Sequence, residues 1–280
     1  MDDLKTAFVT GATNGIGKAI ASGLAKQGLR VIVGARDADK GKAVRDELAA
    51  ATGNANITVA KVDVASRASI AALDLGVPRL DILVNNAGVW YTDRTLSPDG
   101  IELVFATNVL GPHRVTKRVM PLLEAAPAAR VVNVVSAFSK HLDLTDLEFA
   151  RRKYDGFKCY SQSKQALRML TWGLASRFAG TKLTANAVSP GFVKTGFNTN
   201  THGFLSVVLG LSSKLFAVSP ENGAATPIWV ATSRELDGVS GKYFDAMKEK
   251  DGKFREPEAI AELERLCDAY DAKPAAVRAV

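Results

Sequence analysis

Short apolar runs alternate with helical patterns along most of the 280-residue chain, and this alternation constrains the fold more than any other feature. Runs rich in Val, Ile, Ala and Leu are typical of strands that are buried on both faces, as in a parallel sheet. Repeated strand–helix–strand units place helices on both faces of such a sheet. We therefore predict an α/β fold with a doubly wound parallel sheet of about seven strands.

The expected elements follow these runs. Strands are expected at Thr6–Thr10, Val31–Val33, Ile57–Val62, Leu80–Val84, Val131–Val135, Leu183–Val188 and Val239–Phe244. Helices are expected at Gly17–Gly28, Lys40–Ala51, most of Gly100–Pro121 and Tyr160–Phe178, with a surface helix at Pro257–Ala269 in a charged tail. A polar insertion at Ala137–Lys158 and a long connection at Asn198–Ser219 interrupt the rhythm. Because no repeat or low-complexity linker divides the chain, we predict one domain over residues 1–280.

Composition argues against several classes of protein. The net charge is +7, but the longest basic run is Arg151-Arg152-Lys153 and no aromatic residues interleave with it, so we expect no nucleic-acid partner. Two cysteines make no disulfide framework and fit a reducing compartment. No secretion signal is recognisable, and the apolar stretch near Phe204–Leu211 is too short to span a bilayer. We expect a cytoplasmic protein without an integral membrane segment.

The segment Thr10–Gly17 joins the first strand to the first helix and contains Gly11, Gly15 and Gly17. Glycines let a turn tighten and let backbone N–H groups approach a pyrophosphate, and a helix N-terminus favours the anion. A merely tight turn is the alternative interpretation. The position between a strand and a helix within the first 35 residues favours a dinucleotide site, which would also include Thr13, Asn14 and Ile16.

The second strand ends in Gly34-Ala35-Arg36-Asp37, which bears on the choice of dinucleotide. In NAD-preferring sites an acidic side chain near this point holds the ribose 2′-hydroxyl. Counting from Gly11 places Ala35 there, which has no such group. Arg36 follows, and a guanidinium can pair with a 2′-phosphate and stack on adenine. We predict NADP(H); the competing interpretation is that a one-residue shift brings Asp37 to the ribose.

Tyr160 and Lys164 are four residues apart near the start of an expected helix and therefore share a face. A free tyrosine has a pKa of about 10, and a nearby ammonium favours the phenolate and lowers that pKa. A tuned tyrosine can protonate a carbonyl oxygen, or deprotonate an alcohol, as hydride moves at carbon. By itself such a pair is usually a solvated helix face, so its interpretation depends on the residues around it.

Other polar residues are expected at the same edge of the sheet. Ser136 follows the Val131–Val135 strand, where ligands bind in open α/β sheets. Asn85-Asn86-Ala87-Gly88 and Pro190-Gly191 follow two further strands. Asn108 lies in an otherwise apolar helix, and a buried amide needs partners, so it is either a structural bridge or part of a water relay.

Taken together, these pieces resemble the short-chain dehydrogenase/reductase family of single-domain Rossmann-fold enzymes. The resemblance covers about residues 5–245, and the pieces come in the family's order. They are Thr10–Gly17, Asp63, Asn85-Asn86-Ala87-Gly88, Asn108, Ser136, Tyr160-Ser161-Gln162-Ser163-Lys164 and Pro190-Gly191. The residues Gly34–Asp37, the insertion before Tyr160 and the segment Ser189–Thr195 are also similar to the NADP-type retinol dehydrogenase and protochlorophyllide reductase branch.

The resemblance implies a role for each matching residue. Tyr160 would be the acid/base, Lys164 would lower its pKa and hold the nicotinamide ribose, Ser136 would orient the substrate, and Asn108 would anchor a relay water. Asp63 would meet the adenine, Asn86 the adjoining ribose, and Pro190 and Gly191 would shape the nicotinamide pocket. The remaining expected cofactor contacts are Val64, Ala87, Gly88, Val193 and Thr195. The cofactor half would cover about residues 1–130, the catalytic and substrate elements about 131–245 and a helical tail about 246–280, with no metal.

Two departures from the family's pattern are visible. The stretch between Asp63 and Leu80 is short, so we expect a reduced helix there. The insertion before Tyr160 lies beside the helix that many relatives use for subunit contacts, so either a monomer or a dimer is compatible with the sequence.

The expected substrate is a hydrophobic aldehyde or ketone, and a ring-bearing compound is one candidate. The connection at Asn198–Ser219 carries an apolar centre that is compatible with a lid, an ordinary buried face or a membrane-surface contact. The tentative pocket residues are Trp90, Phe138, Phe192 and Phe204. Two alternatives to a reductase remain, a nucleotide-responsive binding protein with the same fold and a non-redox lyase or isomerase.

Overall fold

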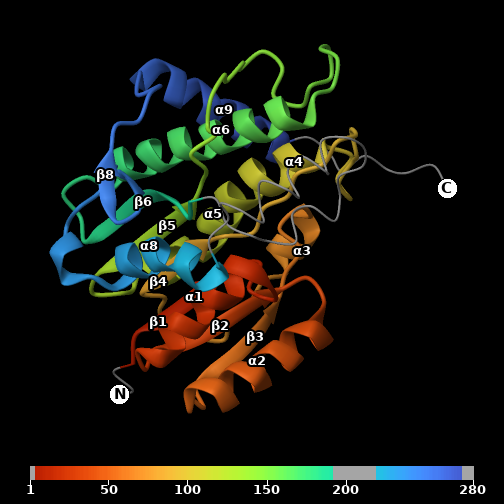
Figure 1. Cartoon of the computed structure of the whole chain (residues 1–280). Helices are drawn as coiled ribbons and strands as arrows, with labels where there is room; N and C mark the ends of the chain where they lie inside the picture. The colour runs from red at the N-terminus through yellow and green to blue at the C-terminus, as the bar shows by residue number, and fades with distance from the viewer. Residues whose placement is uncertain (1–3, 192–218, 273–280) are drawn as a thin grey trace.

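Eight strands form one sheet in the order β3-β2-β1-β4-β5-β6-β7-β8 in the computed structural model, which describes residues 4–191 and 219–272 (Figure 1). Strands β1 to β7 pair in parallel, and β8 runs antiparallel to β7. Because β1 lies between β2 and β4, the order of the strands reverses there, and ligands of open α/β sheets bind beside such a reversal at the carboxyl ends of the strands. The strands are β1 Thr6–Val9, β2 Arg30–Ala35, β3 Ile57–Lys61, β4 Ile82–Asn85, β5 Ala129–Val134, β6 Leu183–Ser189, β7 Tyr243–Asp245 and β8 Lys248–Lys250.

Helices cover both faces of the sheet, as the alternating sequence pattern predicts. They are α1 Gly15–Lys26, α2 Ala38–Thr52, α3 Arg67–Ala71, α4 Leu103–Phe105, α5 Gly111–Glu124, α6 Gly156–Arg177, α8 Pro220–Thr232 and α9 Pro257–Ala272. A π-helical turn, Ala106–Leu110, joins α4 to α5, and a short 3-10 turn, Arg234–Leu236, follows α8. Helices α1, α2 and α8 contribute to the core on one face, and α3, α5 and α6 to the core on the other.

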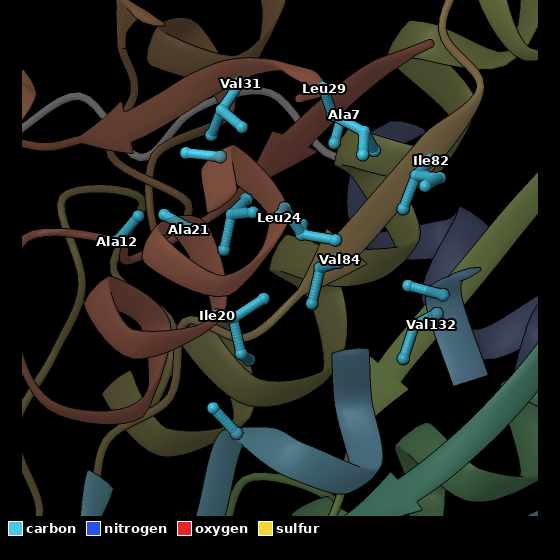
Figure 2. Packing of buried hydrophobic residues seen from close by; sticks show 14 of the residues in the cluster. Ala7, Ala12, Ile20, Ala21, Leu24, Leu29, Val31, Ile82, Val84 and Val132 are labelled. Carbon is cyan, nitrogen blue, oxygen red and sulfur yellow. The ribbon is translucent and has the colours of Figure 1, made fainter. Parts of the chain in front are cut away.

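Strand β1 shows how the sequence builds two cores at once. Ala7 and Val9 point to the α1 side and Phe8 to the α5 side, and all three are fully buried. Figure 2 shows Ile20 and Leu24 of α1 directed toward the strands of the first core. Because both faces of β1 are buried, the strand is held firmly in the sheet, and its last residue sets the position at which the glycine-rich turn begins.

The number of strands exceeds the predicted seven because of β8. This strand reads Lys-Glu-Lys and is exposed throughout, so it carries no apolar pattern that sequence reasoning could detect. The turn into it places both Ala246 and Met247 at positive φ, 49° and 57°. This backbone fits a two-residue hairpin turn, which usually carries Asn-Gly rather than Ala-Met.

The C-terminal helix α9 is more buried than the expected surface helix. It packs along the outer side of α6 (Figure 1), and Leu263 and Cys267 are fully buried. Gly173 of α6 permits this close approach, because an added Cβ would lie 2.5 Å from Oε1 of Glu264. The tail therefore forms an additional layer over α6.

The structure shows both departures from the family's length pattern, the short stretch after β3 and the insertion before α6. Helix α3 has five residues, which confirms the expected reduction of the helix between β3 and β4. The insertion before α6 is held in place by Asp146, which accepts hydrogen bonds from the backbone N–H of Ala150 at 2.8 Å and from Nε of Arg152 at 3.0 Å. Gln162 of α6 donates to the carbonyls of Asp146 and Leu147, so the insertion is joined to α6 by hydrogen bonds.

Candidate active site

The glycine-rich turn between β1 and α1 forms an open cradle of backbone groups. Gly11 and Gly15 have φ values of 64° and 51°, which favour glycine. An added Cβ at Gly17 would lie 2.3 Å from the carbonyl oxygen of Gly11 and 2.4 Å from Nδ2 of Asn86, so only glycine fits. The side chain of Asn14 forms no capping hydrogen bond at the start of α1. The first N–H groups of this helix are therefore suited to a pyrophosphate.

Thr10, which follows β1, and Asn86, which follows β4, hold this cradle in place. The Thr10 hydroxyl oxygen accepts hydrogen bonds from the backbone N–H of Asn86 and of Ala87, at 3.0 and 3.1 Å. Nδ2 of Asn86 donates to the carbonyl oxygens of Thr10 and Gly11, at 3.0 and 3.2 Å. Asn86 thus has a bracing role that the sequence did not indicate, and its predicted contact with a ribose stays a prediction.

Arg36 and Asp37, the two candidates for recognising the adenosine ribose, follow β2 and have different surroundings. Oδ1 of Asp37 caps α2 by accepting hydrogen bonds from the backbone N–H of Asp39 and Lys40, and the bond from Lys40 is the main cause that lowers the pKa of Asp37. Arg36 is exposed, and Ala35 is buried. Lys61 pairs with Ala35 in the sheet register, so a second cation lies near this edge. The capping role of Asp37 favours Arg36 as the recognition residue.

Asp63 and Val64 follow β3 at the same edge of the sheet. Oδ1 of Asp63 accepts a hydrogen bond from the backbone N–H of Ala65 at 3.0 Å, and its own N–H donates to the Ser69 hydroxyl. Val64 is buried, and an added Cβ at Gly111 would lie 2.7 Å from its carbonyl oxygen. These contacts fix the loop that the sequence assigned to the adenine.

Tyr160 and Ser136 meet at the carboxyl end of β5, as predicted. Helix α6 begins after Asp155, whose Oδ1 accepts from the N–H of Lys158, and Tyr160 stands about one turn inside the helix. The Ser136 hydroxyl faces that of Tyr160 closely enough to oppose the rise in the Tyr160 pKa. The backbone N–H of Phe138 donates to the Ser136 hydroxyl oxygen at 3.1 Å, which fixes its direction.

Lys164 is buried beneath Tyr160. Its ammonium donates to the carbonyl oxygen of Val134 at 2.9 Å and lies 5.9 Å from the centroid of the Tyr160 ring. An added Cβ at Gly88 would lie 3.1 Å from Nζ of Lys164, so glycine at this position leaves room for the ammonium. The same added Cβ would lie 3.3 Å from Oδ1 of Asn108, so the structure brings all four predicted catalytic residues to one place.

Electrostatics in the site differ from the sequence expectation. Burial raises the pKa of Tyr160 to about 12, and the Ser136 hydroxyl only partly opposes this shift. Burial lowers the pKa of Lys164 to about 8. The expected lowering of the pKa of Tyr160 by Lys164 is not seen: burial is the main cause of the shift, and Ser136 is the group that opposes it. At neutral pH Tyr160 is therefore protonated and suited to donate a proton.

Asn108, the fourth predicted catalytic residue, lies in the π-helical turn and is fully buried. Its Oδ1 accepts from the N–H of Val89 at 2.8 Å, and its Nδ2 donates to the Val89 carbonyl at 2.9 Å and to the Ser163 hydroxyl at 3.0 Å. The side chain is thus the structural bridge that the sequence offered as one alternative. Its role in holding a relay water stays a prediction.

A row of aromatic rings borders Tyr160. The Trp90 ring lies 6.3 Å from the Tyr160 ring and 6.4 Å from the Phe157 ring, and Phe157 lies 5.8 Å from Phe138, each measured between centroids. Trp90 and Phe138 were predicted pocket residues. Phe157 was missed, although its place one turn before Tyr160 on the same helix could have indicated it.

The remaining predicted site residues divide between two groups. Pro190 and Gly191 follow β6 as expected, and the N–H of Gly191 donates to the Ser189 hydroxyl at 3.2 Å. The other four, together with nearly all of the connection at 198–219, lie outside the described residues; they are Phe192, Val193, Thr195 and Phe204.

One cluster with metal-ligating side chains lies away from this site, formed by His113, Asp268 and Asp271. Asp268 already pairs with His113 at 2.7 Å and with Lys117 at 2.9 Å, and Asp271 pairs with Arg114 at 2.6 Å. These acids therefore join α9 to α5. A search of the described part of the chain for membrane-spanning helices finds none that is long and apolar enough.

The chain is similar to known proteins in both sequence and fold. The sequence profile described as short chain dehydrogenase matches residues 5–203. Retinol dehydrogenase 13 of Homo sapiens is 37% identical over 256 residues, which cover 88% of this chain and 77% of that protein. The crystal structure of a putative uncharacterized protein from Mycobacterium Paratuberculosis has a TM-score of 0.76 at 26% identity and 98% coverage of both chains.

A further solved structure carries a dinucleotide. It is a putative NAD(P) dependent gluconate 5-dehydrogenase from Beutenbergia cavernae with bound NADP at low occupancy. Its TM-score is 0.70 at 26% identity, with coverage of 86% of this chain and 94% of that chain.

Proposed function

We propose that this chain, which belongs to the short-chain dehydrogenase family of oxidoreductases, uses NADP(H) to reduce the carbonyl group of a hydrophobic aldehyde or ketone, or catalyses the reverse oxidation. The observation that carries the proposal is the placement of Ser136 and Tyr160 beside the buried ammonium of Lys164, which lies 5.9 Å from the Tyr160 ring centroid. It brings a proton donor and an orienting hydroxyl to one point at the carboxyl edge of the sheet.

The cradle at the start of α1 supports a dinucleotide. Gly11, Gly15 and Gly17 keep the turn clear of side chains, and the uncapped helix start provides N–H groups for the pyrophosphate. Arg36 is exposed at the end of β2, and Asp37 is engaged in capping α2. This arrangement favours a 2′-phosphate over a free 2′-hydroxyl. The NADP in the similar structure from Beutenbergia cavernae agrees with this choice.

In the proposed reaction, NADPH supplies the hydride when it is bound. The Ser136 hydroxyl orients the substrate oxygen, and the Tyr160 hydroxyl donates its proton to that oxygen. Because burial keeps the pKa of Tyr160 above neutral, the residue is protonated before the reaction, which fits reduction as the favoured direction. Lys164 would hold the nicotinamide ribose from beneath and provide a positive charge as the phenolate forms.

The aromatic row suggests which carbonyl compounds fit. Trp90, Phe138 and Phe157 present ring surfaces beside Tyr160, and such surfaces favour apolar, planar groups over polyols. We propose a small hydrophobic molecule with a ring next to its carbonyl group. A cytoplasmic location and a monomeric or dimeric state stay predictions of the sequence.

The test is NADPH oxidation, followed at 340 nm, against a panel that contrasts aromatic and aliphatic ketones and aldehydes with small sugars and polyols, the polyols being assayed with NADP⁺. We expect turnover of ring-bearing carbonyl compounds. Turnover of small polar polyols alone would contradict the proposed substrate class. Nucleotide binding with no turnover of any compound would favour a binding protein instead.

A further inference from the structure

Arg168 is a buried cation on the catalytic helix that the proposed reaction does not use. It lies four residues beyond Lys164 on α6 and is 6% exposed. Its Nε has no hydrogen-bond partner within residues 4–191 and 219–272, and in the same range no carboxylate lies within ion-pair distance of it. Burial of a charge without a counter-ion is costly. A contribution to stability therefore does not explain an arginine at this position.

The contacts of Arg168 lead to the catalytic centre. One terminal nitrogen, Nη2, donates to the carbonyl oxygen of Ser136 at 3.0 Å. The same oxygen accepts from the backbone N–H of Ser139 at 3.3 Å and from the Ser139 hydroxyl, so it remains paired without Arg168. The Ser136 carbonyl oxygen thus has two other donors, and the hydrogen bond from Arg168 serves to hold its direction.

A second contact reaches the turn after β6. The guanidinium carbon lies 4.0 Å from the centroid of the Tyr243 ring on β7. Tyr243 lies on β7, which pairs with β6 next to Ser189; burial raises the pKa of Tyr243, and the Ser189 hydroxyl lowers it in part. The Ser189 hydroxyl oxygen accepts from the N–H of Gly191. Through Tyr243, Arg168 links the Ser136 turn to the Pro190–Gly191 turn.

We propose that Arg168 is a positioning residue that sets the separation between the Ser136 turn and the Pro190–Gly191 turn, and thereby aligns the Ser136 hydroxyl with Tyr160. The inference rests on the proposed function, in which substrate and nicotinamide lie between these turns. The planar guanidinium suits both tasks, because its edge donates to the Ser136 carbonyl while its face lies on the Tyr243 ring. An alignment error of about 1 Å in such a site can reduce the rate about 100-fold.

The test compares the full-length wild type with Arg168→Met, Arg168→Lys and Tyr243→Phe. Arg177→Met is the matched control, because Arg177 lies on the same helix but is exposed and pairs with Glu264. The measurements are kcat and KM for 4-nitrobenzaldehyde with NADPH, the Kd of NADPH from its fluorescence, and the Tm.

We expect Arg168→Met to lower kcat about 10–100-fold while the KM and the Kd of NADPH change little. Its Tm should be equal to or above that of the wild type, because a buried unpaired charge is removed. Arg168→Lys should restore part of kcat, and Tyr243→Phe should fall between the wild type and Arg168→Met.

Two outcomes would decide against the inference, and a third would decide against the proposed function. An Arg168→Met variant with wild-type kcat would overturn it, as would a parallel loss of Tm, kcat and NADPH binding in both Arg168 variants, which would indicate a structural role. An inactive wild type that binds NADPH would instead refute the proposed function on which the inference rests.

Discussion

Substitution of Gly17 by alanine tests whether the cradle at the start of α1 requires glycine. The new Cβ would lie 2.3 Å from the Gly11 carbonyl oxygen and 2.4 Å from Nδ2 of Asn86. These separations are about 1 Å shorter than ordinary van der Waals contact. The obstructing groups are a backbone atom and an amide held by two hydrogen bonds, so neither can move without loss.

The expected cost combines three effects. Overpacking costs about 1–3 kcal/mol, and displacement of Asn86 weakens two hydrogen bonds, each contributing about 1 kcal/mol. Alanine improves helix propensity by about 1 kcal/mol and offsets part of this loss. The free energy of unfolding should therefore fall by about 1–4 kcal/mol, which at this chain length lowers the Tm by about 2–4 °C for each kcal/mol.

Thermal unfolding and NADPH fluorescence titration measure the two consequences of Gly17→Ala. We expect the Kd of NADPH to rise about tenfold or more, because misdirected N–H groups lose charge-assisted hydrogen bonds to phosphate. Gly23→Ala is the control, since an added Cβ there meets only the side chain of Ile228 among the described residues, and that side chain can rotate. An unchanged Tm and an unchanged Kd in Gly17→Ala would refute the close-approach argument.

Three further substitutions test other parts of the account. Arg36→Ala should raise the KM for NADPH roughly 10–100-fold while the KM for NADH changes little, because only NADPH offers a 2′-phosphate to the guanidinium; equal changes in steady-state assays would contradict the choice of NADP. Leu263→Ala should lower the free energy of unfolding in urea by about 2–5 kcal/mol, and a cost below 1 kcal/mol would show that α9 contributes little to the fold. Burial lowers the pKa of Lys164 from 10.5 to about 8, so the folded state carries a penalty of about 3 kcal/mol below pH 8 that is relieved as the pH rises to about 10.5. Lys164→Met should therefore raise the Tm at pH 7, less the lost hydrogen bond to Val134, and this advantage should shrink between pH 8 and 10.5. A constant difference would show that the pKa of Lys164 is the same in the folded and unfolded states, and so that burial does not lower it.

The sequence predicted the alternation of strands and helices in a parallel sheet, and the meeting of Ser136 with Tyr160, because both depend on local patterns. Continuous apolar runs mark strands buried on both faces, and a residue that follows such a run lies at the carboxyl edge of the sheet. This is why Ser136 and Tyr160 could be expected to meet across 24 residues of chain. Strand β8 has three exposed charged residues and no such pattern, so it could not be found in this way.

Roles that depend on distant partners were beyond local reasoning. The partners of Arg168 are the Ser136 carbonyl and the Tyr243 ring, and neither pairing leaves a periodic signal in the sequence. The bracing role of Asn86 likewise depends on two backbone carbonyls about 75 residues earlier. The pKa of Tyr160 was predicted with the wrong sign, because a charged neighbour is visible in the sequence and the loss of solvent around the hydroxyl is not.

Two features of the sequence had a structural meaning that the sequence predictions did not include. Leu263 and Cys267 are four residues apart and therefore share a helix face, which could have indicated that α9 packs against the domain. Asp37 stands directly before α2, a position where aspartate commonly caps a helix. This reading would already have favoured Arg36 at the adenosine ribose.

The most direct test of the proposed chemistry is a comparison of Tyr160→Phe with the wild type in two measurements on the same preparation. We expect this variant to bind NADPH with a Kd within about threefold of the wild type, because the loss of one hydroxyl leaves the cradle intact, and to lose NADPH-dependent carbonyl reduction by a factor of about 100 or more, as expected for loss of a general acid. Full reductase activity in Tyr160→Phe would contradict the assignment of Tyr160 as the proton donor.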